Sequence, residues 1–308
     1  MNLSEIGKLT EEEVREHMEK TLWPNGPVCP HCGHQGAWTL NGDSYRKGLY
    51  KCKACKEPFT VTIGTIMEDS HLPIRKWLMA FSLMCASKKG ISALQLQRQL
   101  GLGSYQTAWH LCHRIRLAMN EDRTLKPLSG IVEVDEAYIG GKPRGGIDPK
   151  TGNPRPYSKR GRGTSKTPVL ALVERNGKAV SMPMERLSAE KLKGAIKEVV
   201  NKDSRIMTDE WHVYREIDDD FSGGHQTVNH SRKEFARGDV STNTVESYFA
   251  LLKRGIHGAF HHVSKLHLHR YCDEFSFRWN YRKVTDGERT IEAIKGSDGK
   301  RLMYKAIC

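Results

Sequence analysis

The segment Gly130–Gly140 constrains this chain most, because it has the pattern of a β-strand and yet carries three carboxylates. β-Branched residues dominate it, and a glycine stands at each end. The side-chain alternation of a strand places Glu133 and Asp135 on one face and Glu136 on the other. Burying an ionised carboxylate is costly unless a cation meets it. The segment is therefore either a solvated edge strand or a strand on which Asp135 holds a metal ion.

Four of the eight cysteines form two Cys-x-x-Cys pairs with nineteen residues between them. They are Cys29, Cys32, Cys52 and Cys55. Two such pairs at this separation are typical of a zinc ribbon, in which four thiolates close a tetrahedral shell around one structural Zn²⁺. His31 and His34 are close by in the sequence, so a site with three cysteines and one histidine is the alternative.

The charge balance favours a polyanionic partner, since 49 Lys and Arg residues face 36 Asp and Glu residues, for a net charge of +13. Nucleic acid is the simplest such partner, and a solvated basic surface is the alternative. The sequence shows neither the basic and apolar regions of a signal peptide nor a run of 18 apolar residues. We therefore expect a cytoplasmic, nucleoid-associated protein without a membrane span.

Residues 72–119 have helical periodicity, and residues 3–22 predict one further amphipathic helix. Within residues 72–119, a short helix, a glycine turn and a longer helix capped by Ser104 follow one another. This order is the outline of a helix-turn-helix, although an ordinary three-helix bundle has it too. If the longer helix reads DNA, the side chains expected near the DNA are Tyr105, Gln106, Thr107, His110 and Arg114.

Residues 141–167 hold eight basic residues and one acid, and they are rich in glycine and proline. A segment of this length without periodicity is typical of a loop or an insertion. Contact with phosphate groups and simple solvation are both compatible with its charge.

The following residues predict a mixed sheet with helices on its faces. Two strands flank the turn at 175–177, a helix covers 188–201, and a strand ends on Asp209. A further helix is expected from Trp211 and a short strand at 227–229.

Glu246 lies in the first turn of a later helix. Taken alone, it is explained as the capping-box partner of Asn243. Lys253 follows seven residues, or two helical turns, later on the same face. An acid within a strand, an acid at the end of a later strand and an acid on a late helix support a ribonuclease H-like fold, whose sheet brings three distant carboxylates together.

Taken together, these features resemble the DDE transposases of bacterial insertion sequences, in the branch that has an N-terminal zinc ribbon. The matching segments are Val134-Asp135-Glu136 with Tyr138–Gly141, Thr208-Asp209, Asn243–Ser247 with Lys253–Ile256, and the closing block Tyr271–Arg282. The resemblance extends over nearly the whole chain, and the basic segment 141–167 is the part without a clear counterpart.

The resemblance implies that Asp135, Asp209 and Glu246 hold two Mg²⁺ (or Mn²⁺) ions and that Lys253 is the basic partner of the third acid. Lys253 and Arg254 would then contact DNA. Two ions about 3.5–4 Å apart can activate a water and stabilise a leaving oxygen in phosphodiester cleavage. Glu133 and Glu136, which flank Asp135, are expected to be less critical.

The implied activity is cleavage at transposon ends, followed by transfer of the freed 3′-hydroxyl into target DNA. The implied partners are the terminal inverted repeats, the target DNA and further copies of the chain, in a homodimer or a larger assembly. The alternatives are a transposase-derived DNA-binding protein without catalysis and a metal-dependent DNA nuclease of the same fold.

We therefore expect a multidomain α/β protein, in which a zinc ribbon and a helix-turn-helix precede a ribonuclease H-like mixed-sheet domain. The expected regions are an N-terminal helix at 1–22, the zinc ribbon at 23–70, the helical DNA-binding domain at 71–125, the catalytic domain at 126–285 and a C-terminal tail at 286–308.

Overall fold

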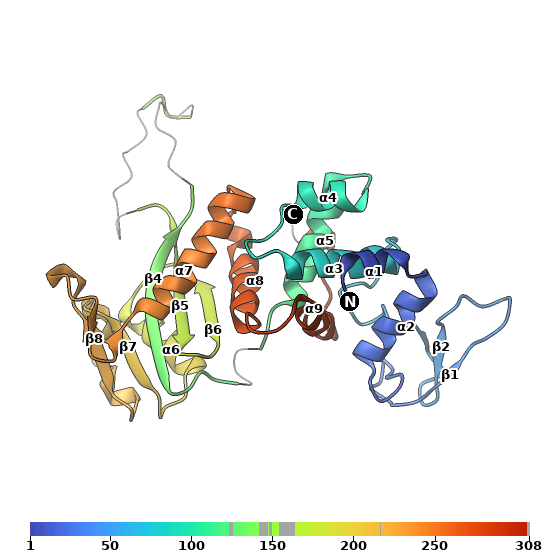
Figure 1. The fold of residues 1–308 in the computed structure, drawn as a ribbon, viewed down its shortest axis with the longest axis horizontal. Coiled ribbons are helices and arrows are strands. Elements are labelled where there is room, and N and C mark those ends of the chain that lie inside the picture. Colours follow the sequence, from blue (N-terminus) through green and yellow to red (C-terminus); the bar gives the residue numbers. More distant parts are fainter. Residues whose placement is uncertain (123–125, 142–146, 148–149, 154–163, 216, 307–308) are drawn as a thin grey trace. The chain divides into compact units, whose positions relative to one another are not determined.

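The chain forms two compact units in the computed structural model, which describes residues 1–122, 126–141, 147, 150–153, 164–215 and 217–306 (Figure 1). The first unit comprises residues 1–121 together with 281–308, and the second comprises residues 122–280. The last 28 residues thus belong to the N-terminal unit. Most of the basic segment 141–167 lies outside the described residues.

The first unit is built around helix α3 (Ile74–Ala86). The helices that contact it most extensively are α1 (Leu3–Lys8), α2 (Glu11–Leu22) and α9 (Asp286–Lys295). A single helix over 3–22 was the wrong prediction: Thr10 accepts a hydrogen bond from the Glu13 amide and starts a new helix with a capping box. Among the described residues, no helix is long and apolar enough to cross a membrane.

The zinc ribbon consists of three short antiparallel strands, β1 (Ala37–Thr39), β2 (Tyr50–Cys52) and β3 (Pro58–Phe59). Its buried apolar cluster is small and consists of Cys29, Cys52 and Phe59, with the rings of Trp23 and Tyr50 packed around Phe59. A core of this size does not stabilise a module by itself, so a bound metal ion would supply much of the folding energy.

Helices α4 (Ala93–Leu100) and α5 (Tyr105–Ala118) follow one another in the predicted order. Gly101 ends α4 in the left-handed conformation, with φ of 57°, which a glycine adopts without steric strain. Ser104 accepts a hydrogen bond from the Thr107 amide and caps α5, as predicted.

The second unit contains a five-stranded mixed sheet with the order β6-β5-β4-β7-β8. The strands are β4 (Ile131–Ile139), β5 (Thr167–Glu174), β6 (Ala179–Pro183), β7 (Arg205–Asp209) and β8 (His225–Val228). Strands β4, β5 and β6 are antiparallel neighbours, whereas β7 and β8 continue the sheet in parallel with β4. The central strand is therefore the acid-bearing one.

Helices cover both faces of this sheet (Figure 1). Helix α6 (Ala189–Val199) packs against one face, in a core that includes Val132 and Val134. Helices α7 (Asn243–Gly255) and α8 (Leu268–Asn280) pack against the other face, in a core that includes Ala137 and Ile139. This arrangement confirms the expected ribonuclease H-like architecture. The helix predicted from Trp211 is only a 3₁₀ turn at His212–Tyr214.

The outer edge of β6 is covered by side chains of α8. The Ala179 amide donates to Asn280 Oδ1 at 2.7 Å, and the Ser181 amide donates to Ser276 Oγ at 3.2 Å. The next backbone nitrogen that faces this edge belongs to Pro183 and carries no hydrogen. These three residues therefore leave no free backbone donor on this edge.

Candidate catalytic and zinc sites

An acidic cluster lies where the pairing between β4 and β7 ends, in the middle of β4 and at the last residue of β7. Carboxylate oxygens of Asp135, Glu136 and Asp209 all lie within 4.8 Å of one another. The parallel ladder pairs Glu133 with Met207, so the same register, continued for two residues, sets Asp135 beside Asp209. The carboxyl ends of parallel strands are a common position for ligand sites in α/β proteins.

The charges in this cluster raise the proton affinity of Asp135. Burial raises the pKa of the Asp135 carboxyl to about 7, and the neighbouring charges of Glu136, Asp209 and Glu246 add to the effect. Carboxylates that repel one another in this way are stabilised when a divalent cation binds between them. Hard oxygen donors are the ligands that Mg²⁺ and Mn²⁺ prefer, so the residues present fit such ions.

Glu246 lies in the first turn of α7 and does not belong to the group of acids whose oxygens lie within 4.8 Å of one another. Its side chain is 51% exposed, and its Oε1 atom lies 3.3 Å from Thr242 Oγ1 and 3.7 Å from His230 Nε2. Its charge contributes to the raised pKa of Asp135, so the two carboxyls interact. The capping-box explanation was wrong, because the N-cap is Thr242 and Asn243 already lies inside the helix.

Two further acids behave differently from what the sequence suggested. Glu136 was expected to be less critical than Asp135, but its carboxylate joins the cluster and accepts a hydrogen bond from the buried Tyr214 hydroxyl at 2.9 Å. Glu133 is completely buried and binds the first turn of α7. Strand alternation concealed the first role, since it places Glu136 on the opposite face from Asp135. Nothing local to the sequence indicated the second.

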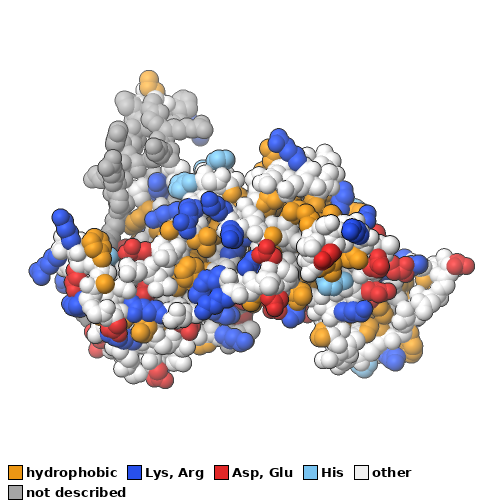
Figure 2. Space-filling view, in the orientation of Figure 1, with side chains coloured by type: hydrophobic (Ala, Val, Ile, Leu, Met, Phe, Trp, Pro, Cys, Tyr) orange, Lys and Arg blue, Asp and Glu red, His pale blue; other side chains and the backbone are white. Residues whose placement is uncertain are grey.

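The basic residues predicted on α7 are available for contact. Lys253 and Arg254 are both exposed. Lys and Arg side chains also gather on the face that carries α7 and α8 (Figure 2).

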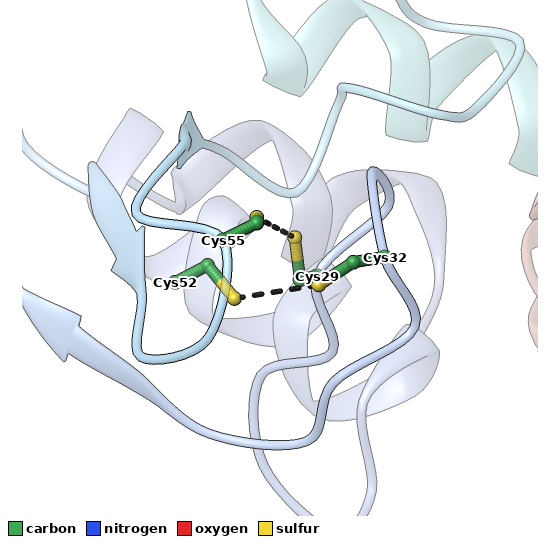
Figure 3. A group of neighbouring side chains, drawn as sticks. All are labelled: Cys29, Cys32, Cys52 and Cys55. Atoms are coloured by element: carbon green, nitrogen blue, oxygen red, sulfur yellow. Dashed lines mark hydrogen bonds between the residues drawn. The ribbon is translucent and has the colours of Figure 1, made fainter.

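The four predicted cysteines converge on one site (Figure 3). Cys29 Sγ lies 3.6 Å from Cys55 Sγ, and Cys32 Sγ lies 3.6 Å from Cys52 Sγ. Zinc–sulfur bonds of about 2.3 Å in a tetrahedron would place the sulfurs roughly 3.8 Å apart, so this geometry suits zinc. Burial alone would raise the pKa of Cys52, but the amides of Cys55 and Ala54 outweigh it and lower the pKa to about 6.

The group that could hold this metal contains the four cysteines and neither nearby histidine. The structure therefore favours the tetrathiolate site over the alternative with His31 or His34.

The predicted DNA-contacting residues of α5 fall into two groups. Tyr105, Gln106 and Thr107 are exposed in the first turn. His110 is half-buried, and its Nε2 atom lies 3.2 Å from the Leu302 carbonyl oxygen. Arg114 is buried, donates to the Glu68 carbonyl and lies over the Trp77 ring. The prediction that Arg114 faces DNA is therefore corrected, because its guanidinium is used inside the unit.

Comparison with known proteins identifies both parts of the chain. Residues 127–280 match the ISXO2-like transposase domain, and residues 9–57 match a transposase zinc-ribbon domain. An uncharacterised protein in the transposable element ISH50 of Halobacterium salinarum is 28% identical over 275 residues, which cover 88% of this chain and 91% of that protein.

Two solved structures with weak similarity are the Mos1 strand transfer complex and a Mos1 transposase paired-end complex with the left transposon end. The first is 13% identical, covers 73% of this chain and 79% of the other, and has a TM-score of 0.29. The second is 14% identical, covers 73% and 80%, and has a TM-score of 0.21. Similarity at this level adds nothing to the family match. Because it matches these two domains, the chain belongs to the ISXO2-like transposase family, in the form that has an N-terminal zinc ribbon.

Proposed function

We propose that this chain is an active insertion-sequence transposase that cleaves DNA at transposon ends and joins the freed 3′-hydroxyl to target DNA. The observation that carries the proposal is the convergence of the Asp135 and Asp209 carboxylates from the neighbouring strands β4 and β7. The relative from Halobacterium salinarum is a protein in a transposable element, which agrees with this function.

Asp135, Asp209 and Glu246 would hold two divalent ions, and Glu136 is close enough to assist them. When bound, such ions supply an activated water and stabilise a departing oxygen. In the first reaction, water attacks the phosphodiester at the transposon end, and the bond to the 3′-oxygen breaks. In the second, the resulting 3′-hydroxyl attacks a target phosphodiester, and a target 3′-oxygen leaves.

The remaining residues of the chain would bind and orient the DNA. The exposed Lys253 and Arg254 offer positive charge to a phosphate beside the acidic cluster. Tyr105, Gln106 and Thr107 present side chains from the first turn of α5, where a recognition helix contacts base edges. The active assembly would be a homodimer or larger, on the terminal inverted repeats of the element.

The test uses full-length protein, a duplex that carries a transposon end, target DNA and Mg²⁺, with nicked and joined products separated on a denaturing gel. Asp135→Ala and Asp209→Ala are expected to abolish both products and to leave binding of the end DNA in place. Nicking without joining by the parent protein would indicate a nuclease. Binding without either product would indicate a DNA-binding protein.

A further inference from the structure

Glu133 is a fully buried carboxylate that four donors surround. The amides of Thr244 and Val245 donate to its Oε2 atom at 2.7 and 3.1 Å. The Thr244 hydroxyl and Arg175 Nε donate to its Oε1 atom at 2.9 and 2.6 Å. Both oxygens therefore have partners, and the carboxylate charge is matched by a guanidinium.

These bonds replace the N-terminal cap of α7. The first amides of a helix have no partner within it, and they normally bond to a side chain of the N-cap residue. Here the N-cap residue Thr242 makes no such bond. Glu133 takes its place from strand β4, and its negative charge also suits the positive end of the helix dipole.

Arg175 connects this contact to the surrounding backbone. It follows β5 directly and also donates to the carbonyl oxygens of Asp239 and Ser241, at 2.5 and 3.1 Å. Ser241 ends the short strand β10 (Val240–Ser241), which leads into α7. The guanidinium therefore ties the residues before α7 to the same carboxylate that holds its first turn.

The position of Glu133 in the sequence connects it to the catalytic acids. It lies two residues before Asp135 on the same face of β4, and the amides that it binds belong to the two residues before Glu246. A displacement of the first turn of α7 moves Glu246 relative to Asp135. Metal sites depend strongly on contacts that orient their ligands, and the loss of such a contact costs about 10–100-fold in metal affinity or activity.

We propose that Glu133 is a positioning residue of the metal site, because it fixes Glu246 on α7 against Asp135 on β4. This inference rests on the proposed function, in which these acids hold divalent ions. It assigns to Glu133 a role that neither the sequence motif nor the acidic cluster indicates. Arg175 and Thr244 share the role through the same carboxylate.

The test measures Mn²⁺ affinity and amide hydrogen exchange on the full-length protein, without reference to DNA cleavage. Glu133→Gln keeps the shape of the side chain and removes its charge. We expect Mn²⁺ affinity to fall about 10–100-fold and the amides at 244–245 to exchange faster. The matched control is Glu274→Gln, since Glu274 is equally buried and lies 2.6 Å from Arg278 on α8. Glu274→Gln should lower the melting temperature and leave the Mn²⁺ affinity at the parent value.

Asp135→Ala separates this inference from the proposed function. If Asp135→Ala binds Mn²⁺ like the parent, the acids are no metal site and both proposals fail. If Asp135→Ala loses Mn²⁺ while Glu133→Gln matches Glu274→Gln, the positioning role alone is overturned. Should Glu133→Gln not fold, Thr244→Val removes a single bond to Oε1. It is expected to weaken Mn²⁺ binding to a smaller extent, and parent affinity in that variant would overturn the role.

Discussion

The zinc site and the acidic site are assembled in opposite ways. The four cysteines lie within residues 29–55, and two tight turns of the chain carry them. The acids lie between residues 135 and 246, on two strands and a helix. A site made by local turns needs only its own backbone and the metal, whereas a site made by distant elements needs a packed core and contacts such as those of Glu133. The first should therefore fail by unfolding locally, and the second should fail by losing chemistry.

The largest effect is expected from loss of the zinc ligands. Cys52→Ser should lose the metal and unfold the ribbon, because structural zinc contributes roughly 10–16 kcal/mol to the folding of small modules. Elemental analysis of the parent should find about one zinc per chain. In the variant, hydrogen exchange should show loss of protection over residues 29–59, whereas strands β4 and β5 stay protected. A variant that retains both its zinc and its protection would contradict the tetrathiolate assignment.

The next effect is expected at Glu246. Glu246→Ala should lower the rate of DNA cleavage by orders of magnitude at an unchanged melting temperature, because it would remove a proposed metal ligand without removing a cap. Glu198→Ala, which removes an exposed acid from α6, is the matched control and should cleave like the parent.

Glu136→Ala sharpens this comparison, since Glu136 belongs to the acidic cluster and Glu246 does not. We expect the smaller loss of rate at Glu136. The reverse order would make Glu136 the third ligand and would remove Glu246 from that role.

A smaller effect is expected on helix α5. Gln106→Ala should weaken binding to the transposon end about tenfold, as the loss of one base contact does, and should not change the melting temperature. Arg114→Ala should lower the melting temperature instead, because this side chain is buried against Trp77 and the Glu68 carbonyl. Fluorescence anisotropy with end and scrambled duplexes at several salt concentrations measures both affinities. Equal affinity of the parent for the two duplexes would refute specific reading by α5.

An effect of pH on stability is expected from the raised pKa of Asp135. In metal-free protein the folded state keeps this proton up to about pH 7, whereas the unfolded chain loses it near pH 4. Between these values the folded state binds more protons, so the free energy of unfolding decreases as the pH rises, and the loss is complete above pH 7. From pH 5 to 7.5, the melting temperature of the parent should therefore fall relative to that of Asp135→Asn. A difference that stays constant with pH would contradict the shift.

The sequence predicted whatever depends on spacing along the chain. The cysteine pairs, the Ser104 cap, the hairpin turn at 175–177 and the strand that ends on Asp209 all lie where local patterns placed them. These patterns are set by turn geometry and side-chain periodicity, which act over a few residues.

The sequence did not predict contacts between distant residues. Glu133 and Arg175 are 42 residues apart, and no local pattern pairs them. Arg114 seemed to be a surface residue because arginine usually is, but the packing of α5 turns it inward. The Glu136 carboxylate joins the cluster although strand alternation places its side chain on the opposite face from Asp135.

The covered edge of β6 restricts how copies of this chain can associate. An open edge strand lets two proteins join their sheets into one, and it also promotes aggregation. Here Asn280 and Ser276 already accept the amide hydrogens of Ala179 and Ser181, and Pro183 offers none. A second copy could add a strand to this edge only by first removing helix α8 from it. While α8 stays in place, an assembly of several subunits therefore cannot extend the sheet from its β6 edge.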